Sequence, residues 1–317
     1  MELLRGLGGL RGRHRPCVAT IGAFDGVHRG HRVVIEQLAQ QSARRGLPST
    51  LVTFEPLPRE YLAPRQAPAR LQSFRERYEA LRALGVERLL CLRFDEALRQ
   101  MSAEHFARAV FVQGLGVRSL VLGDDFRFGR AREGDAALMR EVGAREGFAT
   151  LGTRTIEHAG ERISSSRVRE ALRAGDFALA QDLLGRPYTL SGRVTHGRRL
   201  GRQIGFPTAN IALRRLTLPL AGVYAVAVRG AALAECAAVA NVGRRPSVAE
   251  GLRPNLEVHV LAGNPDLYGQ RLQVRFLRKL REEHKFASID ALKTRIRHDV
   301  QHAREWFAGR AKDHRRS

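Results

Sequence analysis

The segment Gly22–His31, Gly-Ala-Phe-Asp-Gly-Val-His-Arg-Gly-His, carries the densest chemistry in the chain. It follows a short apolar run and precedes a helical pattern, so its backbone N–H groups can approach a phosphate at the positive end of a helix. His28 and His31 are three residues apart and share one helical face. Two imidazoles there can donate to phosphate oxygens as charge builds on a transferring phosphorus. Zinc also suits this spacing, but no third ligand is evident, and two surface histidines after a tight turn are the plain alternative.

Two further segments of the first half carry groups that can contact phosphate. Leu122–Gly129, Leu-Gly-Asp-Asp-Phe-Arg-Phe-Gly, follows an apolar run, and ligands of open α/β sheets bind at the carboxyl ends of strands. A simple Asp/Gly turn explains the same residues. Ile163–Arg169, Ile-Ser-Ser-Ser-Arg-Val-Arg, places three hydroxyls at a helix start. These hydroxyls can act as N-caps or, with the two arginines, clamp a triphosphate.

The second half opens with a glycine-rich segment. Gly192–Ile211 holds four glycines before a Phe-Pro-Thr-Ala-Asn run, which suits a flexible loop that covers phosphate. Pro207 fixes the backbone before Thr208 and Asn210, whose side-chain oxygens are hard donors suited to magnesium. Turn formation is the competing explanation for these two polar residues.

Glu257 lies mid-strand in Leu256–Val260, between apolar neighbours. A charge in that position is costly unless it has a partner or a task. A carboxylate can take the proton from an attacking alcohol. Strand alternation equally allows Glu257 to face outward on a polar side, so the pattern alone leaves both roles open.

The elements that must position these residues change character halfway along the chain. In the first half, apolar runs alternate with helical stretches, which predicts a parallel sheet covered by helices on both faces, a Rossmann-type α/β domain. The expected strands are Cys17–Ile21, Thr50–Phe54, Arg88–Leu92 and Ser119–Leu122, and the expected helices are His28–Arg45, Ser73–Leu84, Ala103–Gly114 and Asp135–Glu146.

The second half is rich in β-forming runs. Short helices near Ser166–Ala174 and Phe177–Leu184 precede Gly185–Pro187, where we expect a domain boundary. Turn residues then separate apolar runs, which predicts a small antiparallel barrel. Its expected strands are Tyr188–Thr195, Gly222–Val228, Ala237–Val242, Leu256–Val260 and Arg271–Phe276, and a C-terminal helix, Ser288–Phe307, should pack on it through Leu292, Ile296, Val300 and Phe307.

Composition favours a cytoplasmic protein of two domains. The chain has 317 residues, no apolar run of membrane-spanning length, and an Arg- and Gly-rich start without the apolar block of a signal peptide. Cys17, Cys91 and Cys236 form no CxxC pair and suit a reducing compartment. The net charge of +22 is dispersed along the chain and aromatic content is 6%, so we expect no specific nucleic-acid partner and no membrane.

Together, the first-half motifs resemble a known enzyme family. The HxGH pattern and the hydroxyl-rich motif ending in Arg are similar to the nucleotidyltransferase superfamily. The strings GAFDGVHRGH, TFEPLPRE, LGDDFRFG and ISSSRVR resemble the FAD synthetase domain of bacterial bifunctional riboflavin kinase/FAD synthetases. The resemblance implies that the FMN phosphate attacks the α-phosphorus of ATP, so that FAD forms and pyrophosphate leaves. The residues it implies for ATP and flavin binding, with His28 and His31 also catalytic, are Gly22, Phe24, Asp25, His28, His31, Asp125, Phe126, Arg127, Ser165, Ser166 and Arg169.

Three positions depart from that family's usual pattern. Ala23 stands where Asn is common, Leu57 where His is common, and Ser166 where Thr is commoner. Ser166 keeps the hydroxyl. Ala23 and Leu57 lose polar groups, so neither is counted as a ligand.

The second-half motifs resemble riboflavin kinase, in the family's order: FPTANI, GVY, NVGRRP, EVH, DLYG and LREEHKF. The resemblance implies that ATP phosphorylates riboflavin to FMN, leaving ADP. Glu257 would be the base, and Thr208 and Asn210 would hold Mg²⁺ with ATP. The implied ATP- and flavin-binding residues are Gly192, His196, Gly197, Gly205, Pro207, Thr208, Asn210, Arg281 and Glu282.

The resemblance thus implies an enzyme of flavin cofactor biosynthesis, with riboflavin, FMN and ATP as small-molecule partners. We expect a FAD synthetase domain over residues 1–185, a riboflavin kinase domain over 186–309 and a basic tail over 310–317. Three rivals are a nucleic-acid-binding protein, an enzyme with only one active domain, and a dinucleotide-dependent oxidoreductase. The last lacks the GxGxxG spacing in Gly22–Gly30.

Overall fold

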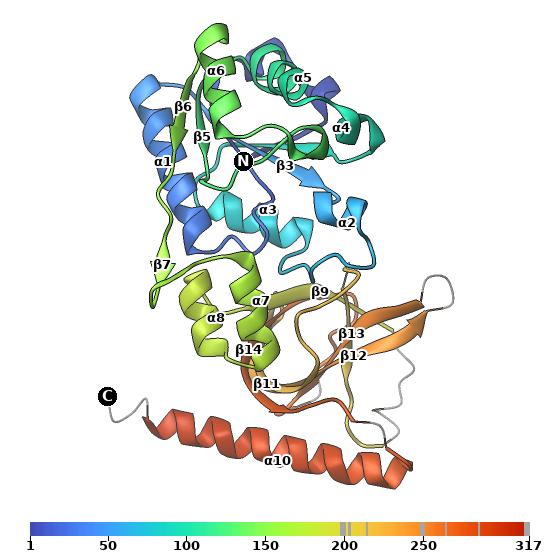
Figure 1. Ribbon diagram of the computed structural model, residues 1–317. Helices are drawn as coiled ribbons and strands as arrows, with labels where there is room; N and C mark the ends of the chain where they lie inside the picture. Colours follow the sequence, from blue (N-terminus) through green and yellow to red (C-terminus); the bar gives the residue numbers. More distant parts are fainter. Residues whose placement is uncertain are drawn as a thin grey trace. The chain divides into compact units, whose positions relative to one another are not determined.

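The computed structural model describes residues 1–196, 201, 204–213, 215–247, 251–263, 265–284 and 286–313. The chain forms two compact units, one of Met1–Pro68 with Phe74–Ser165, the other of Ala69–Ser73 with Ser166–Ser317. The two units have different architectures, an α/β sheet and a β-barrel (Figure 1). Within the described ranges, no helix has the length and apolar character needed to cross a membrane.

The first unit contains a six-stranded sheet in the order β1-β4-β3-β2-β5-β6, and every neighbouring pair is parallel. This confirms the parallel sheet expected from the βα alternation. The first and last strands in sequence, only four residues long, were not expected from the pattern. The strands are β1 Glu2–Arg5, β2 Cys17–Ile21, β3 Ser49–Glu55, β4 Arg88–Arg93, β5 Val117–Leu122 and β6 Ala149–Gly152.

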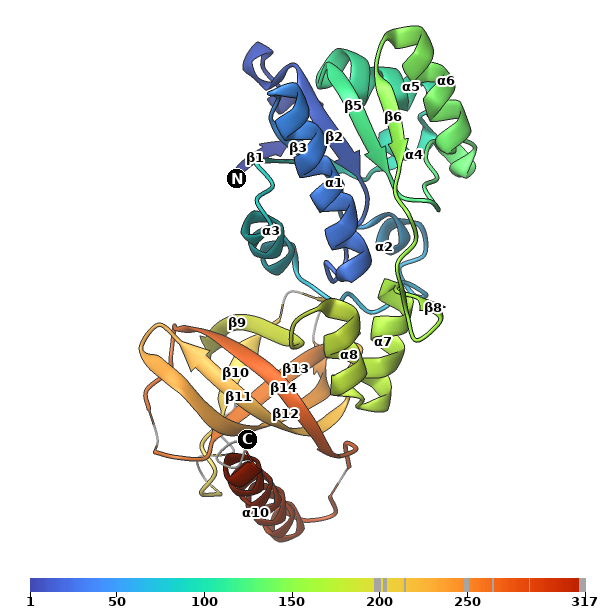
Figure 2. The ribbon, with the colours of Figure 1, turned by 90° about the vertical axis from the view of Figure 1, so that its left-hand side faces the viewer.

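Helices cover both faces of this sheet because consecutive strand residues point to opposite sides. Leu51 and Leu89 join a core with α1 and α3, and their chain neighbours Val52 and Leu90 join another with α5 and α6. Figure 2 shows α1 lying along one face. The helices are α1 Arg29–Arg45, α2 Pro58–Leu62, α3 Phe74–Ala83, α4 Glu96–Gln100, α5 Ala103–Ala107 and α6 Ala136–Glu146.

The helix expected over Ala103–Gly114 changes type partway. After α5, residues Arg108–Gly114 form a π-helical segment. A Cβ on Gly114 would lie 2.8 Å from the carbonyl oxygen of Ala109, five residues back. The wide turn therefore needs glycine at this position, which helical periodicity does not reveal.

The second unit contains a closed antiparallel barrel in the order β10-β13-β12-β11-β14-β9, as expected. Only β10, four residues long, was not expected as a strand. The strands are β9 Thr189–Thr195, β10 Ala209–Ala212, β11 Gly222–Gly230, β12 Leu233–Ser247, β13 Gly251–Val260 and β14 Arg271–Arg281.

Among the described residues, helices α7, α8 and α10 pack within this unit (Figure 2). α10 (Ile289–Asp313) buries Val300 and Ala303 in a cluster with Val223 and Val239 of the barrel, and the expected contacts Ile296 and Phe307 belong to the same cluster. Leu292 is half-buried. α7 (Ser165–Ala174) and α8 (Phe177–Leu184) precede the barrel. The domain boundary expected at Gly185–Pro187 therefore lies inside the second compact unit.

Candidate functional site

The first unit has a cavity of about 700 Å³ at the carboxyl ends of its central strands. Residues that follow β2, β3, β4 and β5 line it, which is where open α/β sheets bind ligands. The cavity gathers eight residues expected from the first-half motifs: Gly22, Phe24, Asp25, His31, Asp125, Phe126, Arg127 and Ser165.

The turn between β2 and α1 is strained. Phe24 and Val27 have φ values of 49° and 41°, in the left-handed region that side chains other than glycine rarely occupy. Such strain costs about 1–3 kcal/mol per residue and persists only where the surroundings hold it. Here the Ser165 hydroxyl donates to the Asp25 carbonyl at 2.8 Å.

The two histidines are stacked at the start of α1. Their ring centroids are 3.6 Å apart, and the His31 ring also lies 4.9 Å from that of Phe24. His28 is buried and caps the helix, because its Nδ1 accepts the His31 N–H at 3.3 Å. In a neutral ring the proton is then on Nε2, so this atom is a hydrogen-bond donor. Among the described residues that line the cavity, His31 is present and His28 is not.

Glycine at position 30 is what lets His28 lie there. A Cβ on Gly30 would be 3.2 Å from two atoms of the His28 ring, which is tight packing against a buried side chain. A larger residue at position 30 would therefore force the His28 ring to shift, so the glycine of His-x-Gly-His also serves packing.

One side of the cavity is aromatic. Phe126 and Phe128 are stacked at 5.0 Å, and Phe54 meets Phe94 edge to face at 5.9 Å. Apolar pockets with a few polar groups are typical of sites for flat organic ligands. The motifs included Phe54, Phe126 and Phe128, but they gave no signal for Phe94, which follows β4 in an ordinary run.

Charged side chains at the cavity form ion pairs with neighbouring side chains. Arg127 pairs with Asp135 at 2.7 Å, and Arg162 pairs with Asp125 at 3.0 Å. Hydrogen bonds from the Leu138 N–H, and then from Arg127, hold the pKa of Asp135 below its ordinary value. Arg99, which also lines the cavity, lowers the pKa of Glu96 to about 2 by hydrogen bonding.

The hydroxyl-rich motif is divided between the two units. Ser165 lines the cavity of the first unit, whereas Ser166 and Arg169 belong to the second. Arg169 is buried there and donates from Nε to the Ala69 carbonyl at 2.6 Å.

In the second unit, three polar residues stand in one row across the barrel. Glu257 of β13 is directly opposite Asn210 of β10 on one side and Asn241 of β12 on the other. Directly opposed residues of antiparallel strands project from the same face, with Cβ atoms about 5 Å apart. Asn210 Oδ1 is buried and accepts no hydrogen bond within the described residues. An orphan oxygen beside a carboxylate fits a bound cation.

The segment before this row is closely packed. A Cβ on Gly192 would lie 2.4 Å from the Ala212 carbonyl, and Gly205 has a φ of 88°. The Pro207 carbonyl lies 2.9 Å from His259 Nδ1. His196 stacks on Tyr268 at 4.2 Å. Gly197, which the resemblance also implied, lies outside the described residues.

Arg281, which the resemblance implied for ATP and flavin binding together with Glu282, is paired with the C-terminal helix. Arg281 makes a bidentate pair with Asp299 of α10, with its closest contact at 2.7 Å, and its guanidinium lies 5.7 Å from the Phe286 ring centroid. Glu282 is exposed and pairs with Lys279. Arg281 is thus held through Asp299, which the motif alone did not indicate.

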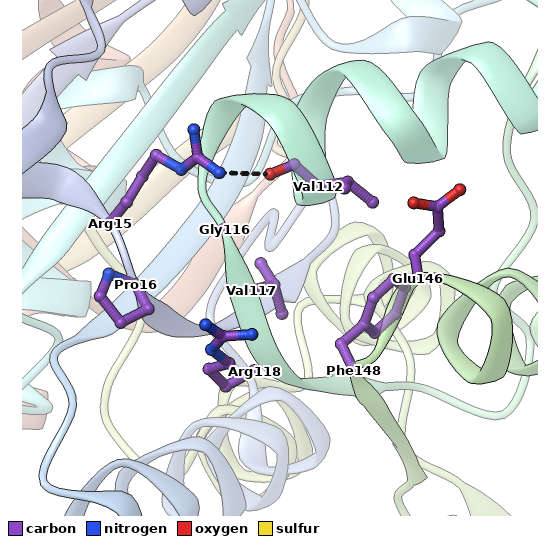
Figure 3. Close-up of a pocket in the computed structure, with 8 residues that line it drawn as sticks. All are labelled: Arg15, Pro16, Val112, Gly116, Val117, Arg118, Glu146 and Phe148. Atoms are coloured by element: carbon purple, nitrogen blue, oxygen red, sulfur yellow. Dashed lines mark hydrogen bonds between the residues drawn. The ribbon is translucent and has the colours of Figure 1, made fainter.

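A smaller cavity of about 200 Å³ lies at the amino ends of β2 and β5, beside Pro16 and Val117 (Figure 3). Arg15 donates to the Val112 carbonyl at 3.2 Å, and Glu146 pairs with Arg108. This end of a parallel sheet is opposite to the end that binds ligands. None of the expected site residues lies there.

Comparison with known proteins gives a match for each half of the chain. The family model for FAD synthetase matches residues 10–167, and that for riboflavin kinase matches residues 184–307. A bifunctional riboflavin kinase/FMN adenylyltransferase from Pseudomonas fluorescens is 50% identical over 304 residues, covering 96% of this chain and 97% of that protein. One from Escherichia coli K12 is 47% identical over 308 residues, covering 97% and 98%.

Among solved structures, a macrolide-efflux protein from Streptococcus pneumoniae is similar to the whole chain. It matches with a TM-score of 0.79 at 28% identity, covering 96% of this chain and 100% of that one. Its fold agrees with the two architectures described above. The identity and mutual coverage of the bifunctional relatives decide the family: this chain belongs to the bifunctional riboflavin kinase/FMN adenylyltransferases.

Proposed function

We propose that this chain makes both flavin cofactors. A kinase domain of residues 186–309 converts riboflavin and ATP to FMN and ADP. An adenylyltransferase domain of residues 1–185 then converts FMN and ATP to FAD and pyrophosphate. The limits of the two family models support this division, and residues 310–317 form a basic tail outside both.

The row of Asn210, Glu257 and Asn241 carries the kinase half of the proposal. Glu257 takes the proton of the riboflavin 5′-hydroxyl, whose oxygen attacks the γ-phosphorus of ATP while ADP leaves. Thr208 and Asn210 would hold Mg²⁺, and the orphan Asn210 oxygen supports that fit. The ion would neutralise charge on the phosphates. The glycine-rich segment from Gly192 would cover them.

The other kinase residues act on substrate binding. Pro207 and Gly205 shape the chain before Thr208, and His196 and Gly197 lie in the phosphate-covering segment. Arg281 and Glu282 border the flavin. Because Arg281 is already held by Asp299, its role is to present the segment to the ring rather than to grip a phosphate.

The cavity that gathers His31 and Ser165 with aromatic rings carries the adenylyltransferase half. An FMN phosphate oxygen attacks the α-phosphorus of ATP, pyrophosphate leaves, and no covalent enzyme intermediate forms. His28 and His31 donate to the phosphates. The flavin ring lies against the aromatic side, near Phe126 and Phe128. The remaining residues of this unit close around the two substrates: Gly22, Phe24, Asp25, Asp125, Arg127 and Ser165. The family pattern also assigns Ser166 and Arg169 to ATP and flavin binding, but these two belong to the second unit.

Both reactions need ATP and flavins of the cell interior, and the three cysteines, all within the described residues, form no disulfide, which supports a cytoplasmic location. The test of the proposal is to incubate the purified chain with riboflavin, ATP and Mg²⁺ and to separate the flavins by chromatography. We expect riboflavin to disappear, FMN to rise first and FAD to follow. If FMN forms but FAD does not, only the kinase half of the proposal stands. If FAD forms from added FMN but riboflavin is not phosphorylated, only the adenylyltransferase half stands.

A further inference from the structure

Arg77 is the largest side chain that the described structure buries fully, with 1% of its surface exposed. It belongs to α3 and to none of the site motifs. A buried arginine is rare, and its charge must be compensated by hydrogen bonds and a partner. The contacts that compensate Arg77 lead directly to the adenylyltransferase cavity.

The guanidinium connects the ends of two strands. It donates to the Ala23 carbonyl at 2.7 Å and to the Phe54 carbonyl at 3.1 Å, and it pairs with Glu55 at 3.1 Å. Ala23 and Phe54 both line the cavity, one after β2 and the other near the end of β3. One side chain therefore fixes the main chain on two sides of the site.

The contact to Ala23 also orients the next N–H. A peptide unit is planar and trans, so its C=O and N–H point in opposite directions. With the Ala23 carbonyl held by Arg77, the Phe24 N–H points away from α3. No hydrogen bond from this N–H is found among the described residues, although Phe24 is buried. A preorganised backbone donor in a left-handed turn suits an anionic oxygen.

We propose that Arg77 is a positioning residue for adenylyl transfer: it holds the Ala23–Phe24 peptide so that the Phe24 N–H faces the phosphate that reacts. The inference rests on the proposed adenylyltransferase function. Arg77 touches neither substrate. Its positive charge and its fork of donors hold the turn, and the strain at Phe24 and Val27 is maintained by this contact together with that of Ser165.

The test compares Arg77→Met with Arg77→Lys. Methionine has no donor, so kcat for FMN adenylylation should fall by about 10²-fold, the effect of losing one oriented oxyanion donor, with little change in KM for FMN or ATP. Lysine keeps the charge and a donor group but lacks the planar fork, so kcat should recover only in part, to a value between that of Arg77→Met and that of the unmodified chain. Riboflavin phosphorylation, a reaction of the other domain, should change less than twofold in both variants.

Arg75→Met is the matched control. Arg75 lies on the same helix, is 67% exposed and pairs only with Glu79 at 2.9 Å among the described residues; its loss should leave both activities unchanged. Thermal unfolding of each variant is recorded, and rates are measured well below the transition. A merely structural role for Arg77 would lower the unfolding temperature of Arg77→Met yet leave its kcat within twofold, and that result overturns the proposal.

If Arg77→Met does not fold, Arg77→Gln takes its place. A glutamine amide keeps a donor but cannot reach both carbonyls and has no charge, so the same loss of kcat is expected, and a normal kcat again overturns the proposal. Failure of the unmodified chain to make FAD from FMN is a different outcome. It would refute the proposed adenylyltransferase function itself, before any variant is compared.

Discussion

Asn255 holds Glu257: its amide Nδ2 donates to Glu257 Oε1 at 2.9 Å. The two residues are two apart on β13 and therefore project from the same face of the strand, and both are half-buried. A neutral donor fixes the direction of the carboxylate without adding a competing charge. The oxygen that would take the riboflavin proton is thus oriented before substrate arrives.

Glu257→Gln should remove the base while keeping its shape. General bases contribute typically about 10²- to 10⁴-fold, so FMN production should fall by that order. FAD synthesis from added FMN should be untouched, because that site belongs to the other domain. Both rates are measured by flavin chromatography. A near-normal kinase rate would remove Glu257 from the mechanism and make it a strand-surface residue.

Asn255→Leu should lower the kinase kcat by a smaller factor, about tenfold, because the base remains but its orientation is lost. KM for ATP should stay the same, since Thr208 and Asn210 are unchanged. The double variant with Glu257→Gln is the control: residues that act as one unit are not additive. If Asn255→Leu lowers kcat by the same factor in the Glu257→Gln variant as in the unmodified chain, Asn255 does not act through Glu257.

His28 caps α1, and its proposed second role, donation to phosphate, can be separated from the first. Asparagine is a good N-cap whereas alanine is not, and a lost cap costs about 1 kcal/mol. We therefore expect His28→Asn to keep the thermal stability of the first unit and His28→Ala to lower it, while both abolish FAD formation and spare FMN formation. FAD synthesis by His28→Asn at the normal rate would mean that His28 only caps α1.

Most residues expected from the first-half motifs lie around one cavity, because the motifs are compact in sequence. The turn Gly22–His31 supplies a strand end, a helix start and two histidines within ten residues, and the parallel topology then determines which other strand ends meet it. Asp125 and Ser165, distant in sequence, line the same cavity for that reason. In the barrel, register places Asn210 beside Glu257.

What the sequence did not predict depends on tertiary contacts. Arg77 lies three residues after Phe74 and four before Leu81, on the apolar face of α3, but arginine is a residue type that is usually exposed. Only the fold shows that it is buried beside Ala23. The ion pair between Arg281 and Asp299 likewise joins two residues that are 18 positions apart in sequence and lie on different elements. The domain boundary was expected at Gly185–Pro187 because β-forming sequence begins there. Phe177, which precedes it, nevertheless packs on the barrel residues Tyr224 and Phe276.

Asp135 gives a pH dependence with a definite sign. Its pKa in the folded chain lies below the ordinary 3.8, so the stability that its charge contributes is fully present above that value and is lost as the pH falls through the lowered pKa. Asp135→Asn keeps an acceptor for the N–H groups of Ala137 and Leu138 but not the charge paired with Arg127. Thermal unfolding should show the variant less stable than the unmodified chain at neutral pH and equal to it at strongly acidic pH. A difference that does not change with pH would contradict this account.

The barrel unit should need the helices that precede it. Phe177 of α8 is buried against Tyr224 and Phe276, with ring centroids 5.8 and 6.1 Å away. A fragment of residues 187–317 leaves those barrel rings exposed, whereas residues 166–317 keep them covered. Burying a phenylalanine stabilises by about 1.5–3 kcal/mol, so the longer fragment should unfold about 5–10 °C higher.

The same two fragments test whether the kinase site is self-contained. Both lack Ala69–Ser73, whose Leu71 carbonyl accepts hydrogen bonds from Tyr188 and Arg215, so both should be less stable than this unit is in the full chain. Residues 166–317 should nevertheless phosphorylate riboflavin at a rate close to that of the full chain, because the Asn210, Glu257 and Asn241 row is complete in the fragment. Circular dichroism establishes that each fragment is folded before its rate is compared. A folded 166–317 fragment without kinase activity would show that the first unit contributes to the kinase site, and equal unfolding temperatures for the two fragments would show that α7 and α8 do not stabilise the barrel.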